Sequence, residues 1–160
     1  MSLSINVEAQ SVDLSKLQWQ FRKSTDSLWL PATVPGTVHT DLLANKKIAE
    51  PFYRDNETQL QWIEKEDWEY KTEILVTEKI LQNDAVELVF EGLDTYADIY
   101  LNNKKILSAD NMFRSWKTDV KSGLKLGSNE LRVYFHSPVN FVMPLYSALG
   151  YILFLSAVMI

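Results

Sequence analysis

Two carboxylates can share acid–base chemistry when they lie roughly 5–10 Å apart. The chain has 21 acidic residues, so chance proximity is easy and spacing alone selects no pair. The densest acidic run is Glu64, Glu66, Asp67 and Glu69, with lysines interleaved. Such alternation is typical of a solvated strand edge, so we interpret the run as structural and assign no catalytic residue.

Histidine and cysteine chemistry is also restricted. The two histidines, His39 and His136, cannot build a three-histidine zinc site, and the chain contains no cysteine. No Gly-x-Ser-x-Gly nucleophile motif and no glycine-rich phosphate loop occurs. We therefore expect no metal and no cofactor. His39 is predicted to pack or hydrogen-bond, and His136 is predicted to lie exposed on the outer face of a strand.

Aromatic side chains are the more promising binding groups, because five of them are Trp. The flat C–H faces of sugars stack on such rings, so a Trp in a loop is a candidate for carbohydrate binding. Trp29, Trp62 and Trp116 lie near predicted turns or loops and are candidates, and Trp62 and Trp116 are the strongest of the three. Trp19 and Trp68 lie on apolar strand faces and are predicted core residues. For each Trp, a role in the core or in a domain interface remains the alternative.

Length and charge narrow the class of protein. The chain has 160 residues, 46% of them hydrophobic and 23% charged, which suits one globular domain. Its net charge of −5 lacks the basic footprint of a nucleic-acid-binding protein. The strongly apolar run at 149–160 is too short for a helix across ~30 Å of hydrocarbon, so we expect no membrane span.

Period-two alternation predicts the elements that must position these residues. In the clearest strand, Asp67, Glu69, Lys71 and Glu73 share a charged face, which predicts a sheet with one side open to water. Thr37 is a predicted N-cap for a short helix, and Asn102-Asn103 suits a type I′ hairpin turn. The predicted strands are 17–23, 29–34, 67–74, 85–91, 97–101, 105–107, 112–120 and 130–136. The pattern indicates an all-β sandwich or barrel with one or two short helices in the first third.

Several blocks of sequence together carry a resemblance to a known family. They are VPGTVHTDLL at 34–43, EPFYRDNE at 50–57, LQWI at 60–63, DWEY at 67–70, FEGLDTYADIYLN at 90–102, ADNMFR at 109–114 and SP at 137–138. Over residues 17–147 the chain resembles the N-terminal, sugar-binding domain of β-mannosidases of glycoside hydrolase family 2. The resemblance implies an all-β fold, a jelly-roll, galactose-binding-like β-sandwich.

The resemblance also implies a function that depends on other domains. In the family, an immunoglobulin-like domain and a TIM barrel follow, and the barrel carries the glutamates for retaining, metal-free hydrolysis of terminal β-D-mannosides. None of those barrel motifs occurs here, so no catalytic residue is carried over. We expect the chain to be inactive alone, to shape the active-site entrance and to support the barrel. Its carbohydrate partner is then the β-mannoside of the intact enzyme.

The candidate substrate-binding residues come from two stretches of these motifs and two Trp. They are Arg54, Asp55, Asn56, Trp62, Asn111, Arg114 and Trp116. The alternative for the first three is a loop held by an Arg–carboxylate pair and by Asn side-chain hydrogen bonds. For Asn111 and Arg114 the alternative is a purely structural role.

The end of the chain departs from the family. Residues 1–147 are expected to form the sandwich, and residues 148–160 an atypical apolar tail where the family turns polar. Missing strands would leave a sheet edge unpaired, so we expect a homo-oligomer through that edge and the tail. Residues 1–20 lack the features of a secretory signal, and the compartment stays open: periplasmic or extracellular if a native signal was removed, cytoplasmic otherwise.

Two other functions remain open from the sequence. The aromatic content is compatible with a stand-alone carbohydrate-binding module. The apolar tail is compatible with a non-catalytic relic or interaction domain that associates through it.

Overall fold

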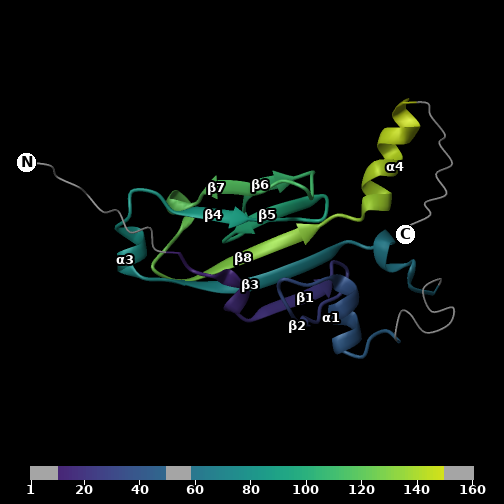
Figure 1. Ribbon diagram of the computed structural model, residues 1–160, viewed down its shortest axis with the longest axis horizontal. Coiled ribbons are helices and arrows are strands. Elements are labelled where there is room, and N and C mark those ends of the chain that lie inside the picture. Colours follow the sequence, from purple (N-terminus) through teal and green to yellow (C-terminus); the bar gives the residue numbers. More distant parts are fainter. Residues whose placement is uncertain (1–10, 50–58, 150–160) are drawn as a thin grey trace, which may run out of the picture.

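The computed structural model describes residues 11–49 and 59–149, which form two antiparallel sheets (Figure 1). A six-stranded sheet has the order β2-β1-β3-β8-β5-β6, and a two-stranded sheet is made of β4 and β7. The strands are β1 Trp19–Lys23, β2 Leu30–Ala32, β3 Trp68–Val76, β4 Glu87–Phe90, β5 Ala97–Leu101, β6 Lys104–Ala109, β7 Trp116–Asp119 and β8 Gly127–Phe135. The helices are η1 Leu14–Lys16, α1 Val38–Ala44, η2 Ile63–Lys65, α3 Glu78–Leu81, η3 Lys121–Gly123 and α4 Pro138–Leu149.

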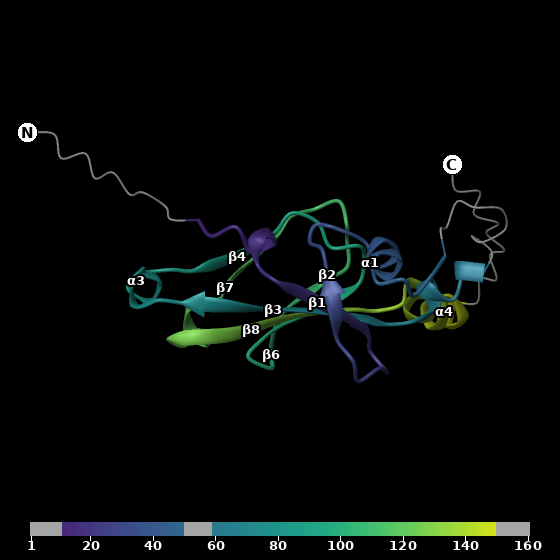
Figure 2. The ribbon, with the colours of Figure 1, turned by 90° about the horizontal axis from the view of Figure 1, so that it is seen from below.

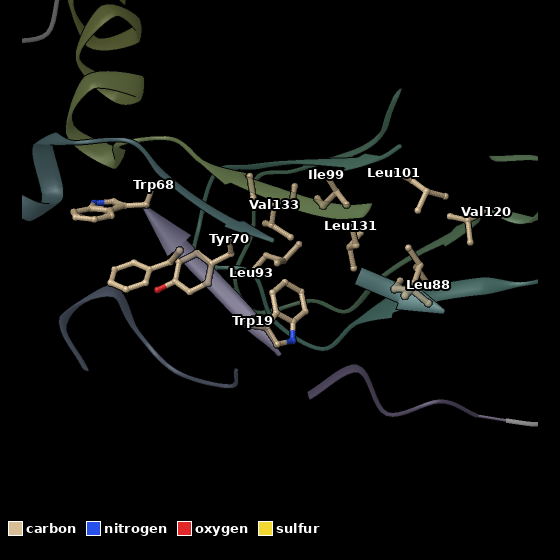
Figure 3. Packing of buried hydrophobic residues seen from close by; sticks show 14 of the residues in the cluster. Trp19, Trp68, Tyr70, Leu88, Leu93, Ile99, Leu101, Val120, Leu131 and Val133 are labelled. Atoms are coloured by element: carbon tan, nitrogen blue, oxygen red, sulfur yellow. The ribbon is translucent and has the colours of Figure 1, made fainter. Parts of the chain in front are cut away.

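The core lies between the sheets and follows the predicted alternation (Figure 3). Phe21 is fully buried, and its ring centre lies 6.0 Å from that of Trp68 and 5.6 Å from that of Tyr70. Burying a side chain of this size contributes roughly 1.5–3 kcal/mol. From the opposite side, Leu88 of β4 and Val120, which follows β7, belong to the same core. The predicted all-β sandwich and the core positions of Trp19 and Trp68 are therefore confirmed.

Helix α1 forms where the sequence predicts it and is fastened to the core by a buried carboxylate. The Thr37 side chain accepts a hydrogen bond from the Thr40 amide, and the Thr40 hydroxyl accepts one from the Thr37 amide, a capping box. Asp41 accepts hydrogen bonds from the Thr33 amide at 2.9 Å and the Tyr70 hydroxyl at 2.8 Å. A side chain at Gly36 would place its Cβ 2.3 Å from the Thr33 carbonyl oxygen, so this approach needs glycine.

The outer face of β3 differs from the prediction at Glu69. The sequence predicts a carboxylate open to water at a strand edge, but β3 is a central strand and Glu69 is only 4% exposed. Arg22 of β1 donates to one carboxylate oxygen at 3.1 Å, and Arg132 of β8 donates to the other at 2.9 Å. The two arginines come from 47 and 63 residues away in sequence and cover Glu69.

A second polar cluster on the same face joins β5, β6 and β8. Asp98 accepts hydrogen bonds from Lys105 and Ser108, both at 2.6 Å, and lies 3.1 Å from Nε2 of His136. Partial burial opposes ionisation of Asp98, but the hydrogen bonds from Lys105, Ser108 and His136 outweigh it and lower the pKa of Asp98. His136 lies on the outer face as predicted, but it is half-buried rather than exposed.

Two predictions about single short segments, one in a turn and one on a helix, have opposite outcomes. Asn102 and Asn103 both have positive φ values, 49° and 65°, as a type I′ turn requires, so that prediction is confirmed. His39 is exposed on α1, so the prediction that it packs is wrong, and within the described residues its side chain makes no hydrogen bond either. Within the described part of the chain, no helix is both long and apolar enough to cross a membrane.

Removing the charge of Glu69 tests the ion pairs across β1, β3 and β8. We expect Glu69→Gln to lower the free energy of unfolding by about 2–4 kcal/mol, because two partly buried arginines lose their counter-charge. Urea unfolding at neutral pH measures the loss. The matched control is Glu73→Gln, an exposed carboxylate on the same strand that accepts a hydrogen bond from Ser128. Equal losses in both variants would contradict the burial argument.

The lowered pKa of Asp98 predicts a pH-dependent contribution to stability. A carboxyl group with a folded-state pKa below its unfolded value, near 3.9, stabilises the fold above that value. The contribution is lost as pH falls through the folded-state pKa. We expect the wild type to lose more unfolding free energy than Asp98→Asn between about pH 5 and pH 3. Asp84→Asn, at an exposed turn, should keep the wild-type pH profile; identical profiles for all three proteins would refute the prediction.

Candidate functional site

One end of the sandwich collects the loops that carry the candidate residues. The register pairs Trp68 with Phe135, Phe135 with Ala97, and Ala97 with Ala109, so the start of β3 and the end of β6 lie together. Phe90 pairs with Trp116, which adds the loops after β4 and before β7. Figure 1 places α1 and α4 at this same end, and α3 at the other. We call this region the loop end.

The segment 110–115 is a compact turn rather than the extended chain predicted for 112–120. Asn111 Oδ1 accepts a hydrogen bond from the Phe113 amide at 2.8 Å, and the Asn111 carbonyl accepts one from Trp116 Nε1 at 3.1 Å. The Arg114 guanidinium lies over the Trp116 ring, 4.1 Å from its centre. The turn therefore groups three of the candidates, Asn111, Arg114 and Trp116, into one local unit.

The contacts within this turn show which of its residues hold the turn and which can contact a ligand. Both hydrogen-bonding groups of Asn111 named above serve the turn, which favours the structural alternative for that residue. The cation over Trp116 covers one side of its ring and restricts sugar stacking there. Arg114 itself is exposed, and its guanidinium donates no hydrogen bond to another described residue, so its donors can reach a ligand. Phe113, at the tip of the turn, is 90% exposed.

Trp62 belongs to a different part of the loop end. It precedes η2, and its ring centre lies 6.0 Å from that of Trp68, so its inner side rests on the core. It remains 39% exposed. No described contact joins Trp62 to the 111–116 turn, so the structure does not bring these candidates into one pocket. The remaining candidates, Arg54, Asp55 and Asn56, lie outside the described residues.

Helix α4 is fastened to the loop end at its first turn. Asp67 accepts hydrogen bonds from the Ser137 amide at 2.6 Å and the Tyr134 hydroxyl at 2.7 Å. The Ser137 hydroxyl donates to the Glu64 carbonyl at 2.7 Å, and Asn140 Nδ2 donates to the Lys65 carbonyl at 2.8 Å. Partial burial and the hydrogen bond to Asp67 raise the pKa of Tyr134. Asp67 is thus a structural acceptor and not a free acid or base.

Sequence reasoning missed the apolar surface of the loop end. Tyr96 stacks on Phe141 of α4 with ring centres 4.3 Å apart, which joins the loop after β4 to that helix. The exposed apolar side chains of the loop end are Trp62, Met112, Phe113, Phe141 and Met143. The pair Met112-Phe113 stands between polar residues, which could have indicated an exposed apolar turn. The prediction of an extended segment at 112–120 hid that signal.

Metal binding finds no support at this end. The described residues hold no group of three or more His, Asp or Glu side chains placed to bind a metal ion. Asp41 and Asp67, two acidic residues near this end, each accept hydrogen bonds that hold the fold. The arrangement can therefore contact a ligand or another domain, and it offers no assembled catalytic pair.

Comparisons with known sequences find similarity to β-mannosidases. The chain is 37% identical over 123 residues to the β-mannosidase of Mus musculus, covering 77% of this chain and 14% of that protein. It is 36% identical over 133 residues to β-mannosidase A of Emericella nidulans, covering 82% of this chain and 14% of that protein. The chain thus spans about a seventh of the length of these relatives.

Solved structures agree with the sequence comparison. The β-D-mannosidase from Dictyoglomus thermophilum has a TM-score of 0.82 and 42% identity, covering 84% of this chain and 16% of that one. An exo-chitosanase from Amycolatopsis orientalis has a TM-score of 0.67 at 21% identity, which shows a shared fold alone. The family model described as glycosyl hydrolase 2 galactose-binding domain-like matches residues 19–156. With most of its residues inside that match, the chain belongs to the glycosyl hydrolase 2 galactose-binding domain-like family.

Proposed function

We propose that this domain serves a β-mannosidase-like glycoside hydrolase, in which its loop end borders the entrance to a separate catalytic domain. The observation that carries the proposal is the 42% identity and TM-score of 0.82 to a β-D-mannosidase. Hydrolysis of terminal β-D-mannosides is the activity proposed for the intact enzyme. The domain contributes shape and support, and another part of the enzyme contributes the chemistry.

The composition of the loop end supports a docking and entrance role. Met, Phe and Arg are enriched at protein interfaces, and the turn presents Met112, Phe113 and Arg114 in sequence. The hydrogen bonds of Asn111 and Trp116 hold that turn before any partner binds. A preformed turn lowers the ordering cost of association. We assign Phe113 to the contact with the catalytic domain and Arg114 to the substrate side of the entrance.

A stand-alone carbohydrate-binding module is less well supported. Such a module needs an aromatic platform with polar neighbours. Arg114 covers one side of Trp116, and the inner side of Trp62 rests on Trp68. Neither ring combines an open face with hydrogen-bonding side chains in the described structure, so the entrance role is favoured.

A domain exchange tests the entrance role. We place residues 19–147 of this chain in the β-D-mannosidase from Dictyoglomus thermophilum in place of the matching segment. The chimera is expected to hydrolyse an aryl β-D-mannoside. Arg114→Ala in the chimera should raise KM about three- to tenfold with little change in kcat. The reason is that the lost contact holds the substrate equally well in the ground state and in the transition state.

The control for this experiment lies at the other end of the sandwich. Lys79→Ala, in α3, should leave both kinetic constants of the chimera unchanged. A folded, active chimera in which Arg114→Ala matches Lys79→Ala would refute the assignment of Arg114. A folded chimera without activity would refute the β-mannosidase role of the domain.

Self-association is a separate part of the proposal. Among the described residues β4 pairs with β7 alone, so its outer edge has unpaired backbone groups that can add a strand from a second copy. The tail invoked for the same oligomer lies mostly outside the described residues. We expect the mass measured by light scattering to rise with concentration. Val89→Lys, on β4, should hinder edge pairing and lower that mass; a monomer at all concentrations would contradict the proposal.

A further inference from the structure

A hollow at the end of the sandwich opposite the loop end has no part in the proposed function. It lies between the turn that joins β5 to β6 and the segment where β7 passes into η3, and its volume is about 410 Å³. The register places it there, because Leu101 pairs with Lys104 and Glu87 pairs with Asp119 at this end of the strands. Its volume falls within the roughly 300–1,000 Å³ that is typical of small-molecule sites.

The two strands that wall the hollow belong to different sheets. Figure 2 shows β4 and β7 in one layer and β3, β8 and β6 in the other. Strand β6 is the last strand of the six-stranded sheet, and among the described residues β7 pairs with β4 alone. The hollow therefore opens to solvent where the edges of the two sheets meet.

A hydrogen-bond network beside the hollow holds its walls in place. Asn102 Nδ2 donates to the Gly123 carbonyl at 3.1 Å and to Asn129 Oδ1 at 2.8 Å. Asn102 Oδ1 accepts from the Glu130 amide at 3.1 Å. Asn129 is fully buried, and its Nδ2 donates to the Lys125 carbonyl at 2.7 Å. The β5–β6 turn and η3 are thus fixed against β8 before any ligand binds, which lowers the ordering cost of binding.

Four side chains of the lining keep hydrogen-bonding capacity for a ligand. Within the described part of the chain, the Lys104 ammonium group makes no ion pair and no hydrogen bond, and the hydroxyls of Thr118 and Ser122 make no hydrogen bond. Asp119 Oδ1 accepts from the Lys121 amide at 3.0 Å, whereas its Oδ2 accepts from no described residue. An ammonium group, a carboxylate oxygen and two hydroxyls are therefore available in one hollow.

The two signs of charge in the lining restrict the kind of ligand. The Asp119 carboxylate repels an anion, and the Lys104 ammonium group repels a cation. A hydroxyl group suits both, because it donates to a carboxylate and accepts from an ammonium group. An extended peptide is matched less well, since only residues 104–106 of β6 line the hollow and strands usually run for about five or six residues.

We propose that this hollow is an auxiliary binding site for a hydroxyl-rich carbohydrate, separate from the entrance at the loop end. Asp119 accepts hydrogen bonds from sugar hydroxyls, Lys104 donates to them, and Ile106 and Val120 offer apolar surface to the sugar C–H groups. The choice of a sugar among hydroxylated ligands rests on the proposed β-mannosidase role.

The lining also sets the strength of binding. None of the residues that line the hollow is aromatic, so the stacking that strengthens sugar binding is missing. We expect a dissociation constant of about 1–10 mM, equivalent to roughly 3–4 kcal/mol. Such a site is too weak for a stand-alone module, and it serves to keep an enzyme close to a sugar polymer.

Nuclear magnetic resonance of the isotope-labelled full chain tests the site with a linear β-mannotriose as the probe. The amide signals of Lys104, Ser122 and Gly123 are expected to shift and to saturate in the millimolar range. Lys104→Gln and Asp119→Asn should each weaken binding about three- to tenfold, because each removes a charged hydrogen-bonding group. Asp119→Asn keeps the side-chain oxygen that accepts from the Lys121 amide, so the turn is retained.

The matched control is another exposed lysine on the neighbouring strand. Lys117→Gln, on β7 and outside the lining, should bind mannotriose like the wild type. Equal weakening in Lys104→Gln and Lys117→Gln would overturn the proposal. The dispersion of the remaining amide signals shows that each variant is folded, so a loss of binding reports on the hollow.

A second probe separates hydroxyl recognition from simple charge pairing. Glycine carries an ammonium and a carboxylate group, and it should cause no shift in the hollow at the concentrations where mannotriose saturates. Shifts with glycine that equal those with mannotriose would overturn the assignment of a carbohydrate ligand.

The outcome is distinguishable from failure of the β-mannosidase role. Mannotriose shifts confined to loop-end residues such as Arg114 and Trp116, or no shifts at all, would overturn the hollow site and leave the chimera assay unaffected. Shifts in the hollow together with a folded but inactive chimera would support the site and refute the hydrolase role alone.

Discussion

The antiparallel register between β3 and β8 is the constraint on which the rest of the structure depends. It runs without interruption from Trp68 opposite Phe135 to Val76 opposite Gly127. Because side chains alternate along a strand, a slip by one residue would turn the faces of one strand over relative to the other. Either Leu131 and Val133 of β8 would then face water, or Glu69 of β3 would face the core. The neighbours β1 and β5 pair with this central couple, so their positions depend on the same register.

The ion pairs on the outer face reinforce that register. Glu69 meets Arg22 and Arg132 only when β1, β3 and β8 are aligned as observed, because each arginine comes from a different strand. The Arg132 guanidinium also lies 4.4 Å from the centre of the Tyr100 ring on β5, which extends the contact to a fourth strand. A buried ion pair is weak evidence for net stability, and its best-attested contribution is to select one arrangement among several. Here it opposes the slip that the apolar core also opposes.

Local patterns in the sequence predicted the elements better than the environments of their residues. Alternation at 67–74 and 130–136 predicted β3, β8 and their inward faces, and Thr37 predicted the start of α1. The burial of Glu69 could not be predicted, because its two partners lie 47 and 63 residues away. The 110–115 turn was missed because apolar residues there mimic a strand, while the Asn111 side chain closes the turn. Of the candidate residues, Asn111, Arg114 and Trp116 do meet, and Trp62 lies apart from them.

The fixed start of α4 links this helix to the register of the central strands. Asp67 binds Tyr134 of β8 and the amide of Ser137 through its two carboxylate oxygens, so the direction of α4 is set by the same strand that sets the register. The loop after β4 is tied to α4 through the stacked rings of Tyr96 and Phe141. The position of this loop and the direction of α4 therefore depend on one set of contacts around the end of β8.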